Sequence, residues 1–393
     1  MTPAARVQAA IELLDLVIAS AKADGAPADR IVTEWFRTRR YAGSGDRRAV
    51  RELVFRAIRA CGPLPPSGRA AMLLLAREDP ALGTLFDGSR HGPAPLVGDE
   101  PVAHPGVAAG WLDRLLAGSD IAGEEATALL QRAPLDLRVN GLKAGRDTIV
   151  LPEPSEPTSA PHALRLAAAA SVEQWPQFGD GLIEVQDTAS QLVCAAVAAR
   201  PGETVIDLCA GAGGKTLAIA ADMDNRGTLI AADIDRNRLS RLAPRAERAG
   251  ASMIETLLLN PPREEEALAS WVGRADAVLV DAPCSGSGTW RRNPEARWRL
   301  TPERMERLAA TQRRVLALAA PLVRPGSRLV YAVCSLLDSE GPDQASAFLA
   351  DHPDWQADPL ALPAGAPRGS GSRLTPYQDG TDGFFVARFL RSC

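Results

Sequence analysis

The chain has 393 residues with a formal net charge of -4, and 46% of the residues are hydrophobic. This length predicts more than one domain, each with its own core. No apolar run approaches the roughly 20 residues that span a bilayer, and no signal-peptide pattern opens the chain, so we expect a cytoplasmic protein without a membrane partner. Six cysteines without framework spacing predict reduced thiols, and four unclustered histidines predict no metal site. The oligomeric state is left open, with a monomer favoured.

The N-terminal part shows helical periodicity. Apolar residues recur at i, i+3, i+4 and i+7 spacing in two stretches: Val7, Ala10, Ile11, Leu14, Val17 and Ile18, then Val50, Leu53, Val54, Ala57 and Ile58. We predict an all-α domain over residues 1–105, which ends in a Pro- and Gly-rich linker. Arginines surround the second stretch, and they form either a solvated helix face or an RNA-facing surface.

A small α+β segment is expected over residues 106–178. Helical spacing returns from Trp111 to Gln131, and short strand-like runs follow at Leu137–Asn140 and Thr148–Leu151. We expect this segment to contact RNA, with Arg138, Asn140 and Lys143 as candidate backbone-contacting residues.

Alternating strands and helices are predicted over residues 179–393. The apolar runs are Thr204–Leu208, Thr228–Ala232, Met253–Leu258, Ala277–Val280, Arg328–Val333 and Phe384–Leu390. Because helix-length segments separate most of them, we predict an α/β domain with a doubly wound, mostly parallel sheet. The last run is expected to add an antiparallel strand.

A Gly-rich loop follows the first of these strands, where such a sheet places its ligand. The loop is Cys209, Ala210, Gly211, Ala212, Gly213, Gly214, Lys215 and Thr216. A phosphate-binding P-loop requires glycine at position 209, and the dinucleotide fingerprint requires glycine at position 216, so both patterns are incomplete here.

Asp233 favours a third kind of ligand. It ends the second strand, about 20 residues beyond the loop, where an acid accepts hydrogen bonds from a ribose diol. Alone, it is equally compatible with a turn or helix-capping aspartate. Loop and acid together predict a nucleoside-containing cofactor, and S-adenosylmethionine fits.

Two cysteines follow later strands of the sheet. Cys284 follows the fourth strand in Asp281-Ala282-Pro283-Cys284, and Cys334 follows the fifth. A thiol beside a methyl donor suits a target as unreactive as C5 of a pyrimidine: thiolate addition at C6 makes C5 nucleophilic. Asp281 is placed to hydrogen-bond the N3 and N4 edge of a flipped cytosine. The alternatives are buried structural cysteines and an aspartate that only supports its loop.

At these residues the chain resembles the Nol/Nop/Sun family of RNA 5-methylcytosine methyltransferases, and within it the bacterial small-subunit ribosomal RNA cytosine-5 methyltransferase B group. The matching motifs are Gln186-Asp187-x-Ala189-Ser190-Gln191, Asp207-Leu208-Cys209-Ala210-x-x-Gly213-Gly214-Lys215-Thr216, Asp281-Ala282-Pro283-Cys284-Ser285-Gly286-x-Gly288-Thr289, Arg291-Arg292-x-Pro294 and Gly380-Thr381-Asp382-Gly383-Phe384-Phe385. They cover roughly residues 138–393, and the N-terminal helices resemble a NusB-like domain.

The resemblance implies a Rossmann-like class I methyltransferase domain over residues 179–393, with S-adenosylmethionine as cofactor and 16S ribosomal RNA as substrate. It implies Cys334 as the nucleophile and Cys284 as the thiol that helps release the product, whereas the Pro-Cys motif alone favours Cys284 as nucleophile. Cofactor contacts are implied for Cys209 through Lys215, Asp233 and Asp281, and Lys215 is also implied to face the target base.

Three departures from the family pattern stand out. Gly211-Ala212 replaces the usual Ala-Pro, and Glu340-Gly341 replaces an acid followed by Asn. After the third strand, Asn260 stands where the family has an acid near the adenine. Two outcomes stay open: either Asn260 supplies one of the hydrogen bonds to the cofactor, or the affinity for the cofactor is lower.

Basic residues after Cys284 are candidates for RNA contact. Arg291 and Arg292 belong to a matching motif; Arg297, Arg299, Arg304 and Arg307 follow, with Trp290 and Trp298 between them. The later members are equally compatible with surface arginines beside core tryptophans. Two other functions stay open: a transfer RNA methyltransferase, and a noncatalytic RNA-binding factor in ribosome assembly.

Overall fold

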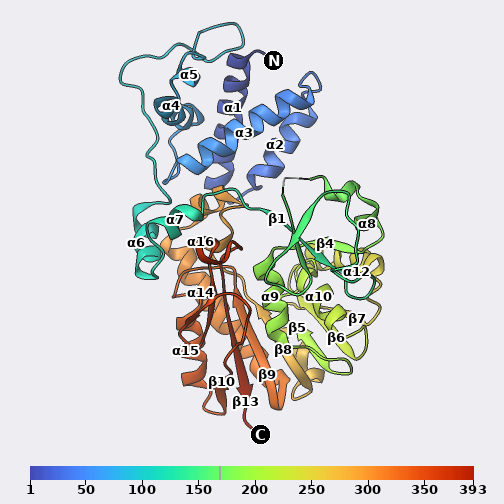
Figure 1. Cartoon of the computed structure of the whole chain (residues 1–393). Helices are drawn as coiled ribbons and strands as arrows, with labels where there is room; N and C mark the ends of the chain where they lie inside the picture. Colours follow the sequence, from blue (N-terminus) through green and yellow to red (C-terminus); the bar gives the residue numbers. More distant parts are fainter. Residues whose placement is uncertain (168–169) are drawn as a thin grey trace. The chain divides into compact units, whose positions relative to one another are not determined.

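A computed structural model describes residues 1–167 and 170–393. The chain forms two compact units (Figure 1): a smaller one of Met1–Arg132 with Thr289–Pro302, and a larger one of Ala133–Gly288 with Glu303–Cys393. The predicted segment 106–178 is therefore divided between them. The physical reason is strand pairing, because β1 (Leu135–Val139) pairs with β4 (Ile183–Val185), which lies beyond the predicted boundary.

The smaller unit is helical, as predicted. Its helices are α1 (Pro3–Lys22), α2 (Ala28–Arg37), α3 (Ser44–Ala60), α4 (Gly68–Glu78), α5 (Pro80–Gly83), α6 (Gly110–Gly118) and α7 (Glu124–Ala128), with the 3-10 turn η4 (Pro294–Arg299). The Thr2 hydroxyl caps α1 by accepting from the Ala5 amide. Most residues of both predicted apolar stretches are buried in one core, with Leu53 packed against it.

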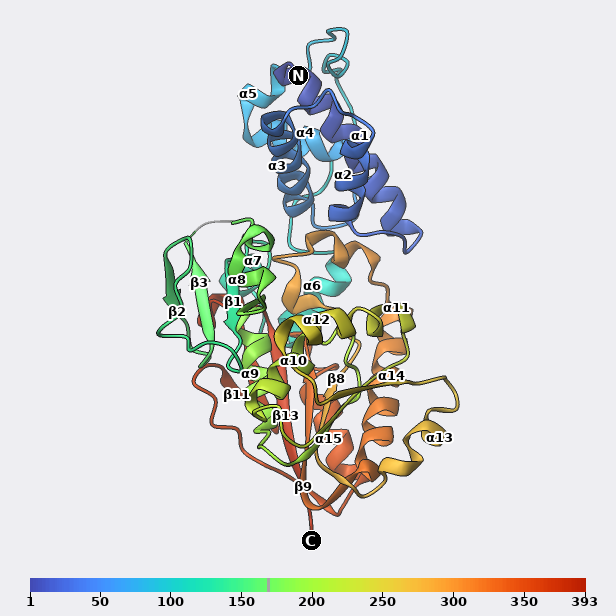
Figure 2. The same cartoon turned by 90° about the vertical axis from the view of Figure 1, so that its right-hand side faces the viewer.

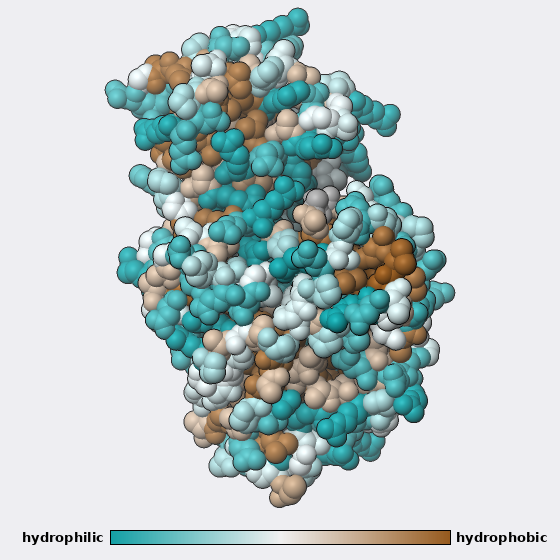
Figure 3. All heavy atoms as spheres, in the orientation of Figure 1, coloured by the Kyte–Doolittle hydropathy of each residue, from teal (hydrophilic) through white to brown (hydrophobic). Residues whose placement is uncertain are grey.

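The larger unit begins with a four-stranded antiparallel sheet in the order β2-β3-β1-β4, in which β2 is Ser155–Pro157 and β3 is Ala163–Leu166. The predicted strand at Thr148–Leu151 is wrong. The amides of Thr148 and Ile149 donate to the Gly145 carbonyl and form a turn instead, and β3 pairs with 155–157. Apolar residues gather at the surface over α8 (Pro176–Gly179) (Figure 3), where the partly buried Phe178 packs against this sheet's core.

The main sheet has nine strands and carries the predicted doubly wound topology. Its strands are β5 (Thr204–Asp207), β6 (Thr228–Asp233), β7 (Ile254–Leu258), β8 (Ala275–Asp281), β9 (Val323–Val333), β10 (Trp355–Ala357), β11 (Ala366–Arg368), β12 (Gly371–Leu374) and β13 (Phe384–Arg391). The order is β11-β12-β13-β9-β8-β5-β6-β7, and β10 pairs with β13. From β7 to β9 all pairs are parallel, while β13 runs antiparallel to β9, as predicted.

Helices cover both faces of this sheet, which explains the continuous apolar runs of its central strands. Val205 packs with α9 (Thr188–Val197) and α10 (Gly214–Asp222), whereas its neighbour Ile206 packs with α14 (Pro302–Ala319) and α15 (Pro342–Asp351). Figure 2 shows α9 and α10 on one side of the sheet, with α13 (Glu264–Leu268) and α14 on the other. The remaining helices are α11 (Arg236–Leu239), α12 (Leu242–Ala249) and α16 (Pro376–Asp379).

Strand order reverses between β5 and β8, since β6 and β7 follow β5 on one side and β8 and β9 lie on the other. In such sheets ligands bind outside the carboxyl ends of the strands at this switch point. The Gly-rich loop leaves β5, and both candidate thiols follow β8 and β9. Among the helices of the described residues, none combines the length and hydropathy required of a membrane span.

Candidate active site

The Gly-rich loop turns sharply between β5 and α10. Gly211 and Gly213 have φ angles of 57° and 82°, in the left-handed region that glycine adopts without strain. A Cβ on Gly213 would lie 2.1 Å from Cδ1 of Leu242, so packing also requires glycine there. By contrast, a Cβ on Gly211 or Gly214 would meet no atom within 4 Å. The loop therefore borders open space, which suits the binding of a cofactor against its backbone.

Two arginines bind backbone carbonyls of this loop. Arg138 Nη1 donates to the Gly214 carbonyl at 2.9 Å, and Arg245 Nη1 donates to the Ala212 carbonyl at 2.6 Å. Arg245 also pairs with the buried Glu184. These hydrogen bonds hold the Ala212 and Gly214 carbonyls and restrict the backbone of the loop.

Buried hydrogen bonds also anchor the loop at its base. The Thr216 hydroxyl donates to Asp207 Oδ2 at 2.6 Å, inside the sheet edge. Burial raises the pKa of Asp207 to about 7, the Thr216 hydrogen bond opposes this rise, and the Asp281 charge adds to it. Cys209, in the same loop, has its pKa raised by burial and by the surrounding carboxylates, so it carries a neutral thiol.

Asp233 lies at the carboxyl end of β6, beside the loop. Its Oδ2 accepts from the Gly211 amide at 2.7 Å, and its Oδ1 accepts from the Asp235 amide at 2.7 Å. Each carboxylate oxygen has a second lone pair, so Asp233 keeps acceptor capacity for a diol. These residues fit a nucleoside cofactor: an acceptor at the strand end and glycines that border open space. Asn260, exposed after β7, occupies the next strand end.

Lys215 and Asp281 connect the loop to β8. Lys215 Nζ lies 2.6 Å from Asp281 Oδ2, and it also lies 5.2 Å from the ring centroid of Phe384. Burial works to lower the pKa of Lys215, but the Asp281 charge outweighs it and the net pKa is raised. Lys215 is therefore a permanent cation that orients the Asp281 carboxylate.

The two candidate thiols are brought together. Cys284 Sγ and Cys334 Sγ lie 3.4 Å apart, although 50 residues separate them. The hydrogen bond with Cys334, then burial and the neighbouring Glu340 charge, raise the pKa of Cys284 well above its usual range. Cys284 therefore keeps its proton at neutral pH. The structure supports shared chemistry at this pair rather than two separate structural cysteines.

Close backbone contacts join the motifs around the thiols. The Gly288 amide donates to the Cys334 carbonyl at 3.1 Å, and the Gly383 amide donates to the Gly288 carbonyl at 2.8 Å. A Cβ on Gly288 would lie 2.0 Å from the Gly383 oxygen, so only glycine fits. Gly341, which stands where the family pattern has Asn, is under a similar packing constraint, because a Cβ there would lie 2.8 Å from Cγ of Phe385.

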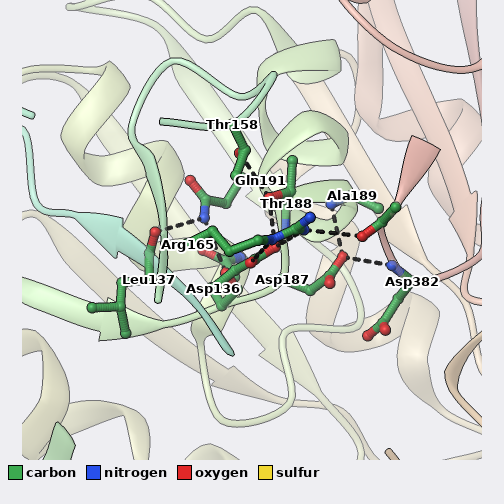
Figure 4. A network of polar contacts seen from close by, with 11 residues as sticks. Asp136, Leu137, Thr158, Arg165, Asp187, Thr188, Ala189, Gln191 and Asp382 are labelled. Atoms are coloured by element: carbon green, nitrogen blue, oxygen red, sulfur yellow. Dashed lines mark hydrogen bonds and ion pairs between the residues drawn. The ribbon is translucent and has the colours of Figure 1, made fainter. Parts of the chain in front are cut away.

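The motif at 186–191 meets the motif at 380–385 in a polar network (Figure 4). The Asp187 carboxylate accepts from the amides of Ala189 and Asp382, so it both caps α9 and holds the C-terminal motif. Arg165 binds Asp136 through two hydrogen bonds and donates to the Gly380 carbonyl at 3.0 Å. The network thereby fixes the start of β13 beside the site.

The RNA-contact predictions for Arg138 and Asn140 need correction. Both side chains are buried; Arg138 holds Gly214, and the Asn140 amide donates to the carbonyls of Gly181 and Ala249. Their side-chain N–H groups point into the protein and donate hydrogen bonds to these backbone carbonyls. Lys143 is exposed, although its Nζ donates to the carbonyls of Asp180 and Arg248.

The arginines after Cys284 divide into two kinds. Arg291 and Arg292 belong to the smaller unit, in which Arg291 is buried and Arg292 half-buried. Arg297 donates to the Ile58 and Cys61 carbonyls, and Arg299 to that of Ala26. Trp290 and Trp298 are buried, as the alternative expected, but Arg297 is buried too and is not a surface arginine. Arg304 is half-buried and Arg307 exposed.

Sequence reasoning missed several residues that support the site. Arg245 and Glu184 gave no signal, because single charged residues are normally expected at the surface. Ser285, Ser335 and Glu340 surround the thiols, and their only signal was their place in or near the matching motifs. Within residues 1–167 and 170–393, no group of His, Cys, Asp and Glu side chains is arranged to hold a metal ion.

Comparisons with known proteins give one consistent picture. The family model described as 16S rRNA methyltransferase RsmB/F matches residues 194–390. A probable ribosomal RNA small subunit methyltransferase B from Synechocystis is 36% identical over 67% of the chain. That alignment spans 61% of the length of the relative.

Solved structures show the same fold. The crystal structure of PH0851 matches with a TM-score of 0.78 and 25% identity, covering 100% of this chain and 99% of that one. NSun6 from Pyrococcus horikoshii, crystallised with SFG, matches with a TM-score of 0.63 and 18% identity. This second match covers 72% of this chain and 98% of that one, and at its low identity it shows the fold alone.

Proposed function

Because this chain belongs to the 16S rRNA methyltransferase RsmB/F family, we propose that it methylates C5 of a cytosine in 16S ribosomal RNA through a covalent intermediate on Cys334. The methyl donor is S-adenosylmethionine. The observation that carries the proposal is the thiol pair, whose sulfurs lie 3.4 Å apart. The two cysteines follow β8 and β9, which are neighbours in a doubly wound sheet, the type of sheet that binds cofactors at this edge. The family membership supports the RNA substrate, and the loop with Asp233 supports the donor.

Residues of the larger unit have separate tasks in this proposal. The loop 209–215 and Asp233 hold S-adenosylmethionine, with Asn260 as a further contact; this cofactor supplies the methyl group. Asp281, oriented by Lys215, hydrogen-bonds the N3 and N4 edge of a cytosine taken out of its stack. The pair thereby holds the base and favours protonation at N3 as charge builds on the ring.

The two thiols act in sequence. The Cys334 thiolate adds to C6, which places an electron pair at C5 for attack on the methyl group. Transfer of the C5 proton to a solvent water then restores the double bond and expels the Cys334 thiolate. Cys284, which keeps its proton, donates a hydrogen bond to the Cys334 sulfur and stabilises the thiolate as it leaves. Cys284 thus promotes release rather than attack.

Two basic residues, the exposed Lys143 and the half-buried Arg292, complete the proposal. Lys143 lies on the larger unit and Arg292 on the smaller one, and we assign both to the RNA backbone. With a net charge of -4, the protein is expected to bind RNA weakly without its specific target.

Bisulfite sequencing of RNA from a deletion strain tests the proposal. One 5-methylcytosine in 16S ribosomal RNA is expected to disappear and to return with the wild-type gene or with Cys393→Ala, a control at an exposed thiol. The Cys334→Ala gene is expected not to restore it. Loss of a transfer RNA site instead would name that substrate and contradict the ribosomal one. A strain that loses no 5-methylcytosine would favour the noncatalytic assembly factor.

A further inference from the structure

A buried carboxylate lies under the thiol pair. Glu340 is fully buried, and it comes six residues after Cys334 at the turn before α15. Its Oε1 accepts from the Ser285 amide at 2.8 Å and from Gln312 Nε2 at 3.1 Å. Its Oε2 accepts from the Ser335 hydroxyl at 2.6 Å and from the Ser285 hydroxyl. One side chain therefore binds the residue that follows each thiol.

The donors come from three separate elements. Ser285 follows β8, Ser335 follows β9, and Gln312 lies on α14. Gln312 also donates to the carbonyl of Pro283, the residue before Cys284, at 2.9 Å. The carboxylate thus connects the chain on both sides of Cys284 with the chain after Cys334.

A second set of contacts tightens the same connection. The hydroxyls of Ser285 and Ser335 lie 3.1 Å apart, and those of Ser287 and Ser335 are also 3.1 Å apart. The Leu336 amide donates to the Ser287 hydroxyl at 2.9 Å. The Tyr331 hydroxyl donates to the Glu340 carbonyl at 2.5 Å, which fixes the backbone of the glutamate itself.

Glu340 differs from an ordinary buried ion pair. Glu264, which is also buried in the same unit, binds the arginine Arg314 on α14. The donors that bind Glu340 are hydroxyls, one amide N–H and one glutamine side chain, and all belong to the surroundings of the thiols. Burying a carboxylate costs free energy unless its hydrogen bonds are made. The hydrogen bonds to Glu340 offset this cost and at the same time hold their donors in fixed positions.

We propose that Glu340 is the positioning residue of the thiol pair: its carboxylate holds Ser285 and Ser335 together and thereby sets the distance and direction between the Cys284 and Cys334 sulfurs. Its catalytic consequence rests on the function proposed above, because only a covalent mechanism needs both sulfurs in fixed places. A misplacement of about 1 Å costs on the order of 100-fold in rate.

The shape of the site distinguishes three substitutions. In Glu340→Gln the amide oxygen accepts from the Ser285 amide and Gln312, while the amide nitrogen donates to the two hydroxyl oxygens, so the connection survives without the charge. Glu340→Asp is one methylene shorter and does not span both serines. Glu340→Ala removes the acceptor of four hydrogen bonds.

Disulfide formation measures the thiol pair without RNA or cofactor. Diamide takes two electrons and two protons from the pair, and peptide mapping quantifies the bond between 284 and 334 in the full-length protein. We expect this oxidation to be at least about tenfold slower in Glu340→Ala and Glu340→Asp, and within about threefold of wild type in Glu340→Gln. Glu264→Ala, the matched buried carboxylate, should oxidise at the wild-type rate.

Methyl transfer gives the second readout. Glu340→Ala should lower kcat by about 100-fold with little change in KM for S-adenosylmethionine, and Glu340→Gln should restore most of the rate. If Glu340→Ala does not fold in a thermal melt, Ser335→Ala decides, since it removes one of the four hydrogen bonds to Glu340 and should slow both reactions.

The outcomes separate the two proposals. Wild-type oxidation in folded Glu340→Ala, or in Ser335→Ala where that variant has to decide, would overturn the positioning role. Oxidation that follows the predicted order, in a protein that methylates no RNA, would leave the positioning role standing and contradict the proposed function alone.

Discussion

Lys215 Nζ lies 2.6 Å from Asp281 Oδ2, and this ion pair joins the loop after β5 to the end of β8 across the switch point of the sheet. Lys215 opens α10, while Asp281 precedes Cys284 by three residues. The pair thus connects the cofactor side of the site with the thiol side. Both side chains are mostly buried, so their mutual attraction is only partly screened by solvent.

Lys215→Met should destabilise the protein, because it leaves the Asp281 carboxylate without its partner. We expect a loss of about 2 kcal/mol in the free energy of unfolding, below the value for a fully buried pair since Asp281 is partly exposed. Urea unfolding measures it. The double variant Lys215→Met/Asp281→Asn should recover part of the loss; a double variant less stable than the single one would contradict the pairing.

Asp233→Ala should weaken cofactor binding. It removes the acceptor of the Gly211 amide and the proposed acceptor of the ribose diol. We expect the Kd for S-adenosylmethionine to rise by at least about tenfold, the value of a lost charge-assisted hydrogen bond. Calorimetric titration measures it, with Asp235→Ala as the control because the Asp235 side chain caps α11 instead. Equal affinity in Asp233→Ala and wild type would exclude Asp233 from the cofactor site.

Asp207→Asn should change how stability depends on pH. Burial raises the pKa of Asp207 from 3.8 to about 7, so the native state binds its proton more tightly than the unfolded state. Its contribution to stability is fully present below about pH 4 and is lost as the pH rises through 7. The variant should therefore gain stability relative to wild type between pH 4 and 7. Urea unfolding across that range would contradict this if the difference stayed constant.

Arg297→Met should destabilise the smaller unit. Arg297 donates to the carbonyls of Ile58 at 2.6 Å and Cys61 at 2.8 Å, at the end of α3, and burial lowers its pKa to about 9. Loss of these charged donors should cost about 3 kcal/mol. Hydrogen exchange should show faster exchange in α3, whereas the exposed Arg307→Met should leave α3 unchanged. Protected α3 amides in Arg297→Met would restore Arg297 to the RNA candidates.

Sequence reasoning predicted the parts of the fold that local patterns encode. The strand runs from Thr204 to Leu390, the loop after β5 and the positions of both thiols follow from apolar runs and motif spacing, and each strand is present. The absence of a strand at Thr148–Leu151 was not predictable, because these residues have strand-like composition. The partner strand of β3 is instead formed by residues 155–157.

The failures have a common physical cause. Arg138 and Asn140 were assigned to RNA and Arg297 was left open between RNA contact and a surface position, yet each binds backbone carbonyls far away in the sequence. Glu340 gave only a weak motif signal, since its partners Ser285 and Gln312 are 55 and 28 residues away. Such contacts depend on the assembled fold rather than on local sequence.

The division of labour between the thiols is tested most directly by a denaturing gel with 16S ribosomal RNA and S-adenosylmethionine. Cys284→Ala should accumulate a covalent protein–RNA adduct, because the Cys334–C6 bond forms but is released slowly. Cys334→Ala and the double variant should form none, and Cys334→Ala should transfer no methyl group. An adduct that forms with Cys334→Ala, or methyl transfer that continues in it, would contradict the assignment of Cys334 as the nucleophile.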